Sequence, residues 1–474
     1  MIDRAEVLAV ATDLSLSHDV VEKDYVLGWL LAGIAAHASL GPSWIFKGGT
    51  CLKKCYFETY RFSEDLDFTL PDAAHLDEGF LRDAFVGVAT WVYEQSGIEL
   101  PVEQMRFKLF PNPRGGQSGE GRIYYTGPLG RGGSLPRIKL DLTSDEVLVL
   151  PSVLRPVTHP YTDAPAGGMV ARCYAYEEVF AEKVRALGER TRPRDLYDVI
   201  NLFRHGEFRP AAAVILDVLT RKCAFKRMAL PTVASLAGAT GELAADWQAM
   251  LGHQLPALPP FESYWEALPG FFRWLEGGAE PVPLAPVPLG ADAEVIRPAV
   301  GALRRAGIRG SAVLEVIRFA AANRLCVDLA YRGRVPRVEP YSLRRTQADE
   351  ILLCAIRAES GEARSYRLDR IEGAQVTKQV FTPRYEVELS PMAIGPIPPL
   401  TRPSSAQSFG RSLGVSSRVS RGGRPKSGPT YVFECNLCGK KFEHSSNDPR
   451  LRAHKDPGGY ACSGRAGFLV DTNN

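Results

Sequence analysis

The sequence has no apolar run long enough to cross a bilayer, since its longest run covers only residues 26–36 of 474. Its first ten residues carry charges where a secretory signal peptide requires an apolar segment. We therefore expect a cytoplasmic protein with no membrane partner. A strong net charge is also lacking, because the formal charge is only +3. This value excludes a chain that binds polyanions over its whole surface, so any nucleic-acid contact must come from local patches.

The cysteines do not form the dense, evenly spaced pattern of a secreted disulfide framework. Six of the nine stand in apolar or mixed surroundings and are interpreted as reduced core residues: Cys51, Cys55, Cys173, Cys223, Cys326 and Cys354. The other three cluster near the C-terminus and belong to a separate pattern: Cys435, Cys438 and Cys462.

Length and shifts in composition predict several domains. Residues 1–275 are expected to form an α+β domain, followed by a linker at 276–294 that is rich in proline, glycine and alanine. Residues 295–390 are expected to form a second compact domain. Residues 391–433 contain no acidic residue and predict a disordered basic linker, which leaves a small terminal module at 434–474.

Two carboxylates suggest a metal site in the first domain. Asp65 and Asp67 stand at the start of an expected strand, and residues i and i+2 of a strand point to the same face. A divalent cation would remove the repulsion between them, and Mg²⁺ keeps coordination positions for phosphate oxygens. Gly48 and Gly49, before an expected helix, would let the backbone approach a phosphate.

A third carboxylate, Asp141, lies in an expected strand at residues 137–142. An antiparallel pairing with the Asp65 strand would bring it to the same site, where three acidic groups can hold two metals. Lys183, on an expected helix at 176–188, could reach a triphosphate. Taken singly, a DxD pair or two adjacent glycines usually mark a solvated turn, but the ordered combination favours a catalytic site.

The motifs KGGT, RFSEDLDF, IKLDL, EEVFAEKVRAL and RPRDLYDV, in this order, resemble the AbiEii/AbiGii nucleotidyltransferase toxin family over residues 15–275. The resemblance implies an α+β, DNA polymerase β-like fold with a helical C-terminal portion, and a magnesium-dependent enzyme. The nucleotide-binding residues that it implies are Gly48, Gly49, Thr50, Ser63 and Lys183. The catalytic residues that it implies are Asp65, Asp67, Asp141, Lys183 and Asp198, of which the first three would bind magnesium.

Short strands with glycine turns in residues 311–390 predict a small β-barrel. Their order resembles a WYL domain, an Sm-like barrel that senses nucleic-acid or nucleotide ligands in bacterial regulators. The tripeptide that names that family is replaced here by Ile351-Leu352-Leu353, which leaves the ligand open. The candidate ligand contacts, which are equally explained as solvated positions, are Tyr331, Arg364, Arg367 and Arg370.

The CxxC pair Cys435 and Cys438 predicts a zinc-finger-like module, with His454 and Cys462 completing a tetrahedron. Both gaps are longer than in the two-cysteine, two-histidine finger that it resembles, and His444 is a less favoured ligand. A short module with few apolar residues needs such a metal to fold. With the arginines of residues 391–433, it is expected to contact nucleic acid, although a plain solvated linker explains any single arginine at least as well.

The sequence as a whole favours an enzyme that transfers a nucleoside monophosphate from an NTP to an acceptor hydroxyl. The family resemblance implies an RNA 3′ end, such as that of tRNA, as the acceptor. It also implies a toxin or phage-defence effector with a cognate antitoxin as a partner. Two alternatives remain open, namely a protein side chain as acceptor, and a non-catalytic regulator that only senses nucleotides and binds nucleic acid.

Overall fold

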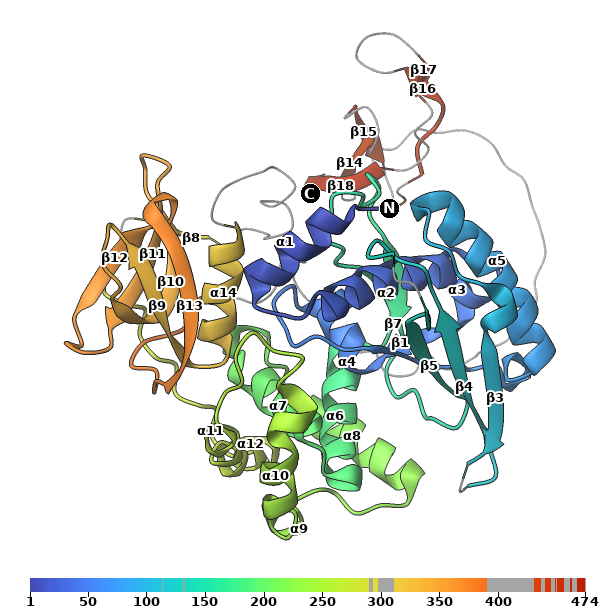
Figure 1. Ribbon diagram of the computed structural model, residues 1–474, viewed down its shortest axis with the longest axis horizontal. Coiled ribbons are helices and arrows are strands. Elements are labelled where there is room, and N and C mark those ends of the chain that lie inside the picture. Colours follow the sequence, from blue (N-terminus) through green and yellow to red (C-terminus); the bar gives the residue numbers. More distant parts are fainter. Residues whose placement is uncertain are drawn as a thin grey trace, which may run out of the picture. The chain divides into compact units, whose positions relative to one another are not determined.

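The computed structural model forms two compact units, residues 1–399 and residues 400–474 (Figure 1). The structure describes residues 1–112, 114–130, 133–289, 293–296, 311–389, 430–435, 440–444, 448, 450–455, 461–462 and 467–473. Residues 391–429, where the sequence predicts a disordered linker, lie outside this set. Among the described residues, none of the helices combines the length and the hydropathy that crossing a bilayer requires.

A seven-stranded sheet with the order β3-β4-β5-β2-β1-β7-β6 lies at the centre of the first unit. Its strands are β1 (Ile45–Lys47), β2 (Asp65–Thr69), β3 (Arg106–Pro111), β4 (Gln117–Tyr124), β5 (Arg137–Thr143), β6 (Val153–Pro156) and β7 (Val170–Cys173). The strands β2 and β5 are adjacent and parallel, so the expected antiparallel pairing is wrong. The reason is the long connection between them, since a helix and the β3–β4 hairpin intervene and allow a crossover.

The first five helices include the two long ones that pack on each other beside this sheet, α2 and α5. The helices are α1 (Arg4–Leu14), α2 (His18–Ala36), α3 (Leu40–Ser43), α4 (Gly48–Cys51) and α5 (Glu78–Ser96). The helix α2 is apolar around most of its circumference because it contacts α1, α5 and β7. The expected helix at residues 50–60 is shorter in the structure, where α4 continues as a π-helix only to Tyr56.

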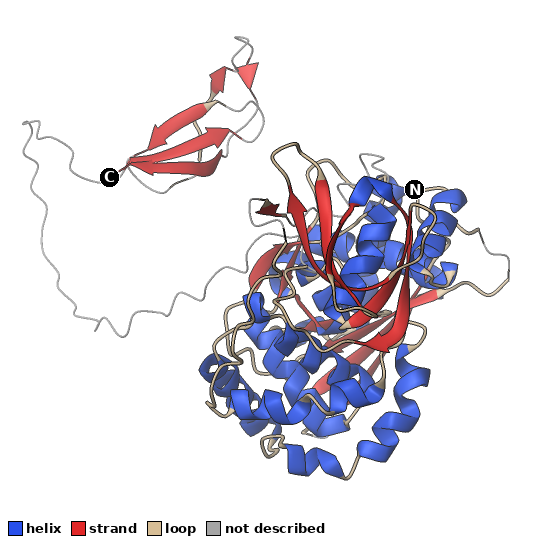
Figure 2. Ribbon diagram, turned by 90° about the vertical axis from the view of Figure 1, so that its left-hand side faces the viewer, coloured by secondary structure: helices blue, strands red, loops and turns tan. Residues whose placement is uncertain are grey.

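Residues 176–275 form a separate helical part, as the sequence predicts (Figures 1 and 2). Its helices are α6 (Tyr176–Arg190), α7 (Pro193–Arg204), α8 (Ala212–Lys226), α9 (Val233–Ala237), α10 (Thr240–Leu251), α11 (Phe261–Trp265) and α12 (Leu268–Leu275). The turn between α6 and α7 is tight, with Thr191 at φ 43° and Pro193 at the first position of α7. Stacked aromatic rings such as Phe180 and Trp274 join α6 to α12.

A second sheet, with α14 packed against it, follows in the same unit. Its elements are β8 (Glu294–Val295), α14 (Ser311–Ala322), β9 (Leu325–Tyr331), β10 (Arg337–Arg345), β11 (Ile351–Arg357), β12 (Ala363–Arg367) and β13 (Ile371–Val380). The strand order is β12-β11-β10-β9-β13, and all pairings are antiparallel. Since no pairing between β12 and β13 occurs among the described residues, the sheet is open there rather than a closed barrel.

Buried polar contacts join this second sheet region to the helical part. The Oδ1 atom of Asn323, after α14, accepts hydrogen bonds from the hydroxyls of Tyr197 (2.9 Å) and Tyr264 (2.6 Å). Arg318 of α14 forms an ion pair of 2.9 Å with Glu58, and both side chains are buried. The two regions that composition separates at residues 276–294 therefore fold as one unit.

The terminal unit contains a three-stranded sheet, β15-β14-β18, and a short hairpin. Its strands are β14 (Thr430–Cys435), β15 (Lys441–His444), β16 (His454–Lys455), β17 (Ala461–Cys462) and β18 (Gly467–Asn473). Because β14 begins at Thr430, the module starts four residues before the expected boundary. Phe433, Cys435 and Leu451 form its small buried cluster.

The variant Asn323→Ala should weaken the whole first unit. It leaves the hydroxyls of Tyr197 and Tyr264 without their buried acceptor, which costs about 2–4 kcal/mol. Urea unfolding of the full chain, followed by tryptophan fluorescence, measures this loss. The control is Gln375→Ala, an exposed position on β13, which should change the midpoint little. Equal midpoints for the two variants would contradict the inferred joint unit.

Candidate active site

Three carboxylates lie next to one another on the central sheet. The register of the parallel pair β2–β5 places Asp67 beside Asp141, and Asp65 begins the same strand. On its other side Asp67 pairs with Lys47 of β1. All three acidic side chains are partly buried. The sheet therefore brings together the three acidic residues that the sequence singles out.

Burial and mutual repulsion perturb these carboxylates. Desolvation, followed by the charge of Asp141, raises the pKa of Asp67 to about 6 and also raises the pKa of Asp65. The charges of Lys47 and Lys183 act against this rise at Asp67. A carboxylate whose ionised form is disfavoured by burial and by a like charge is suited to bind a cation.

The oxygen atoms of the three carboxylates do not all lie within 4.8 Å of one another. Among the described residues, the groups whose ligand atoms all lie within 4.8 Å of one another consist of cysteine and histidine. Lys139 holds Asp141 to one side through an ion pair of 2.8 Å. Mg²⁺ takes one or two protein carboxylates and completes its shell with phosphate oxygens and water, so Asp65 and Asp67 with Asp141 nearby fit this ion.

The glycine turn between β1 and α4 packs directly against the carboxylates. Gly48 has φ +82°, and a Cβ atom there would overlap the Oδ2 atom of Asp67. A Cβ atom at Gly49 would overlap the guanidinium of Arg61 and lie 3.2 Å from the Ser63 hydroxyl. Gly48 thus requires glycine because of its positive φ, a larger residue at Gly49 would have to displace the Arg61 guanidinium, and Ser63 lies beside the turn.

The side chain of Thr50 is engaged within the protein. Its side chain is 1% exposed, and its hydroxyl donates to the backbone carbonyl of Asp65 at 2.5 Å. The hydroxyl therefore connects α4 to the start of β2. Through this bond the turn and the carboxylate strand hold each other in position.

Lys183 and Asp198 form a buried pair behind the carboxylates. The Nζ atom of Lys183 lies 2.8 Å from Asp198 and 3.7 Å from Asp195. Asp198 is fully buried, and it also accepts two hydrogen bonds of 2.7 Å from Arg61 and one from Tyr60. The charge of Arg61 and that of Lys183 hold the pKa of Asp198 far below its usual range despite burial. Asp198 thus orients two cations.

A cavity of about 260 Å³ opens beside Asp67. Gly48 and Lys183 line it, together with charged residues that sequence reasoning did not assign to the site: Lys47, Glu146, Glu182, Arg185, Arg190 and Lys226. Burial lowers the pKa of Lys47 to about 8. Lys47 has a sequence signal in its place next to the two glycines, and Glu182 has one in its place before Lys183. Glu146, Arg190 and Lys226 have none, because they come from the ends of other elements or from a connection.

A second cavity of about 260 Å³ opens beside Asp65. Its lining is mostly basic and comes from α2, β4 and β5: Lys23, Arg122, Arg137, Lys139, and the acidic Glu120. Asp65 and Asp67, which belong to one strand, therefore each border a different cavity. Both cavities carry several positive charges.

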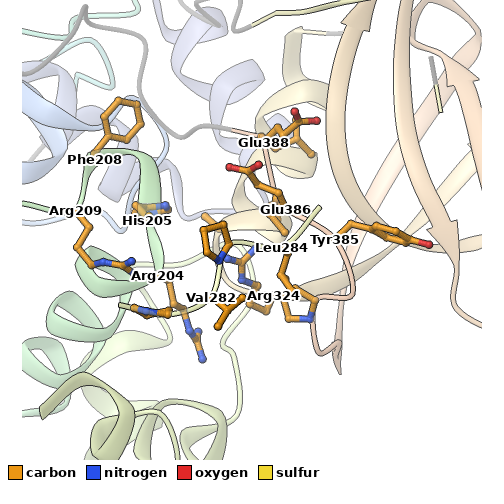
Figure 3. A pocket seen from close by; sticks show the side chains of 18 residues that line it. Arg204, His205, Phe208, Arg209, Val282, Leu284, Arg324, Tyr385, Glu386 and Glu388 are labelled. Carbon is orange, nitrogen blue, oxygen red and sulfur yellow. The ribbon is translucent and has the colours of Figure 1, made fainter. Parts of the chain in front are cut away.

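A larger cavity, of about 430 Å³, lies where α7, residues 281–284 and the segment after β13 meet (Figure 3). Arg204, Arg209 and Arg324 line it, and none of the three carboxylates does. The expected ligand contacts of the WYL-like region are absent from its lining. Two of them are engaged elsewhere, since Arg364 pairs with Glu362, and Arg367 with Glu350 and Asp369.

In the terminal module, Cys435, His454 and Cys462 offer three ligand atoms within 4.8 Å of one another. The two sulfur atoms are 3.8 Å apart. Such spacing is compatible with one zinc ion. The remaining expected ligand, Cys438, lies outside the described residues.

Several solved structures are similar to this chain. One is the nucleotidyltransferase toxin MenT4 from Mycobacterium tuberculosis H37Rv, with 20% identity, 66% of this chain and 99% of that chain covered, and a TM-score of 0.42. Another is JHP933 from Helicobacter pylori, with 18% identity, 55% and 95% coverage, and a TM-score of 0.34. No curated protein sequence matches the chain.

The family comparison covers the region that contains the site. Residues 29–270, about half of the chain, match the model described as the nucleotidyl transferase AbiEii toxin of type IV toxin–antitoxin systems. The matched segment includes the glycine turn, the three carboxylates and the Lys183–Asp198 pair. This chain belongs to the AbiEii family of nucleotidyltransferase toxins.

Proposed function

We propose that this protein transfers a nucleoside monophosphate from an NTP to a hydroxyl of RNA, with the 3′ end of tRNA as the acceptor. One observation carries the proposal: the carboxylates of one strand lie between two basic cavities. A nucleotidyltransferase that extends a nucleic acid needs a place for two polyanions, the triphosphate and the acceptor, on either side of its metal ligands.

The cavity beside Asp67 is suited to the triphosphate. Its turn at Gly48 lets backbone approach an anion, and Lys47 and Lys183 bring positive charge. Asp65, Asp67 and Asp141 would hold Mg²⁺, which when bound stabilises charge on the attacking and leaving oxygens. Asp198 acts as a positioning residue, because it fixes Lys183 and Arg61 without reaching the cavity.

The cavity beside Asp65 is suited to the acceptor. Four basic side chains surround it, and phosphate contacts of this kind position a nucleic acid without reading its sequence. A protein hydroxyl as acceptor would not require such charge. This difference favours RNA over a protein side chain.

We further propose that the terminal module holds Zn²⁺ through Cys435, Cys438, His454 and Cys462, and recruits RNA together with the WYL-like region. The spacing of the three described ligands supports this assignment. As a toxin of this family, the protein would act in phage defence and be neutralised by a cognate antitoxin.

The variant Asp67→Asn tests the reaction. We expect a loss of transfer by at least about 10²–10³-fold, because the metal loses a charged ligand. The metal-free variant should melt at or above the wild-type temperature, since a disfavoured charge is removed. The assay incubates labelled NTPs with total RNA or with lysate protein, and Asp83→Asn, exposed on α5, is the control. Label in protein alone would contradict the RNA acceptor, and unchanged transfer by Asp67→Asn would contradict the site.

The Mg²⁺ requirement should depend on pH. Since the pKa of Asp67 is about 6, a proton competes with the metal below that pH. The Mg²⁺ concentration for half-maximal transfer should therefore rise about tenfold for each pH unit below 6 and stay nearly constant above 7. Transfer rates measured over a Mg²⁺ series at each pH provide the test. A requirement that is constant down to pH 5 would speak against Asp67 as a ligand.

The variant Arg137→Ala should weaken binding of the RNA acceptor and leave binding of the NTP unchanged. Arg137 is exposed on β5 and lines the cavity beside Asp65. We expect the KM for RNA to rise about tenfold and the salt dependence of transfer to weaken, with the KM for NTP unchanged. Lys108→Ala, exposed on β3 and outside either cavity, is the matched control. A larger rise in the KM for NTP than for RNA would reverse the assignment of the two cavities.

A further inference from the structure

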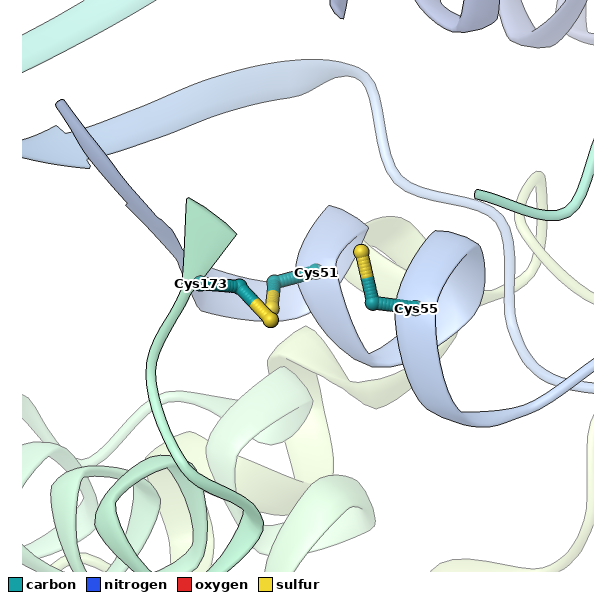
Figure 4. A group of neighbouring side chains, drawn as sticks. All are labelled: Cys51, Cys55 and Cys173. Atoms are coloured by element: carbon teal, nitrogen blue, oxygen red, sulfur yellow. The ribbon is translucent and has the colours of Figure 1, made fainter. Parts of the chain in front are cut away.

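Three thiols meet in the core directly behind the glycine turn (Figure 4). Cys51 ends α4, Cys55 lies in the π-helix that follows, and Cys173 ends β7. Positions four apart on a helix share one face, so Cys51 and Cys55 both turn toward β7. All three side chains are completely buried, and their sulfur atoms lie within 4.8 Å of one another.

This spacing suits a metal ion. Thiolates bind zinc at about 2.3 Å, so two sulfur ligands of a tetrahedral ion are about 3.8 Å apart. Small side-chain adjustments within the observed limit of 4.8 Å would reach that value. The ligands come from two elements that are distant in sequence, which is typical of an ion that joins parts of a fold.

A buried arginine lies beside the thiols. Arg155 on β6 is 5% exposed, and its Nε atom donates to the carbonyl of Cys55 at 3.2 Å. Its guanidinium lies over the ring of Tyr56, 5.0 Å from the centroid. The Nη2 atom has no hydrogen-bond partner, and Arg155 forms no ion pair with any described residue. A buried cation without a counter-charge costs several kcal/mol, so this site calls for a negative group.

We propose that Cys51, Cys55 and Cys173 bind one soft divalent cation of the Zn²⁺ type as three thiolates. The charge of the site then balances, because the ion and Arg155 together carry three positive charges. The three thiol protons leave to solvent as the metal–sulfur bonds form, and no oxidation takes place. The Tyr56 hydroxyl lies 3.9 Å from the Cys173 sulfur and donates to the carbonyl of Tyr174 at 2.6 Å, so we assign it as a neighbour of the site and not as a ligand.

The position of this core thiol site suggests what it does. Cys173 pairs with Phe46 of β1, the residue before Lys47, and Cys51 ends the helix that starts at the glycine turn. A metal here would link β7 to α4 and stiffen the helix that begins at the glycine turn. Its role is structural, since none of the three cysteines lines the cavity beside Asp67.

The test uses the full chain with the terminal module disabled by Cys435→Ser and Cys438→Ser. Elemental analysis of this protein after equilibration with Zn²⁺ and removal of free metal should find about one zinc per chain. Adding Cys173→Ser should abolish this zinc. Adding Cys223→Ser, a buried cysteine of α8 outside the cluster, should leave it in place. Arg155→Met should weaken zinc binding in competition with a chelator by about tenfold or more.

A measurement without core substitutions guards against misfolded variants. X-ray absorption at the zinc edge of the protein carrying only the two terminal substitutions should show sulfur ligands without histidine. The proposal is overturned if this protein, with a native circular dichroism spectrum, binds no zinc. It is also overturned if mass mapping of the protein without reductant recovers a disulfide between Cys51 and Cys173.

Discussion

The candidate site depends on a strand pairing that holds two like-charged carboxylates next to each other. The parallel pairing of β2 with β5 sets Asp67 beside Asp141, although burial and repulsion disfavour their ionised forms. Backbone hydrogen bonds between the strands, rather than any attraction between the side chains, keep the two carboxylates adjacent. Their ionised forms are disfavoured where they stand, and a bound cation would relieve this penalty.

Around the three carboxylates, cationic side chains pair with further carboxylates that are buried more deeply. Buried carboxylates hold three cationic side chains through ion pairs. Asp198 pairs with Arg61 and Lys183, and Asp195 pairs with Arg190, so the orientation of each cationic group is fixed. Long cationic side chains lose much conformational freedom when they bind a phosphate, and fixing them in advance reduces that cost. The helical part therefore contributes to the candidate site through α6 and α7, whereas the three carboxylates lie on strands.

The sequence was informative where chemistry and local pattern coincide. The glycine turn, the strand with Asp65 and Asp67, and the helices from residue 176 onward follow from motif and periodicity, and the family match covers them. The parallel direction of β5 was missed because alternation of side chains is the same in both strand directions. Arg190 and Lys226 were missed because their proximity to Asp67 arises only from tertiary packing. The hydrogen bond from the Thr50 hydroxyl to the carbonyl of Asp65 was also missed, since no local sequence pattern indicates it.

The contacts between α14 and the rest of the first unit bear on where the folded unit of this protein ends. The family match stops at residue 270, but the acceptor of the Tyr197 and Tyr264 hydroxyls is Asn323, and Arg318 reaches back to Glu58. A polypeptide cut at the homology boundary would expose the apolar face that α14 covers and lose these buried partners. The family match and the compact unit thus end at different residues, so homology alone does not mark where the folded unit ends.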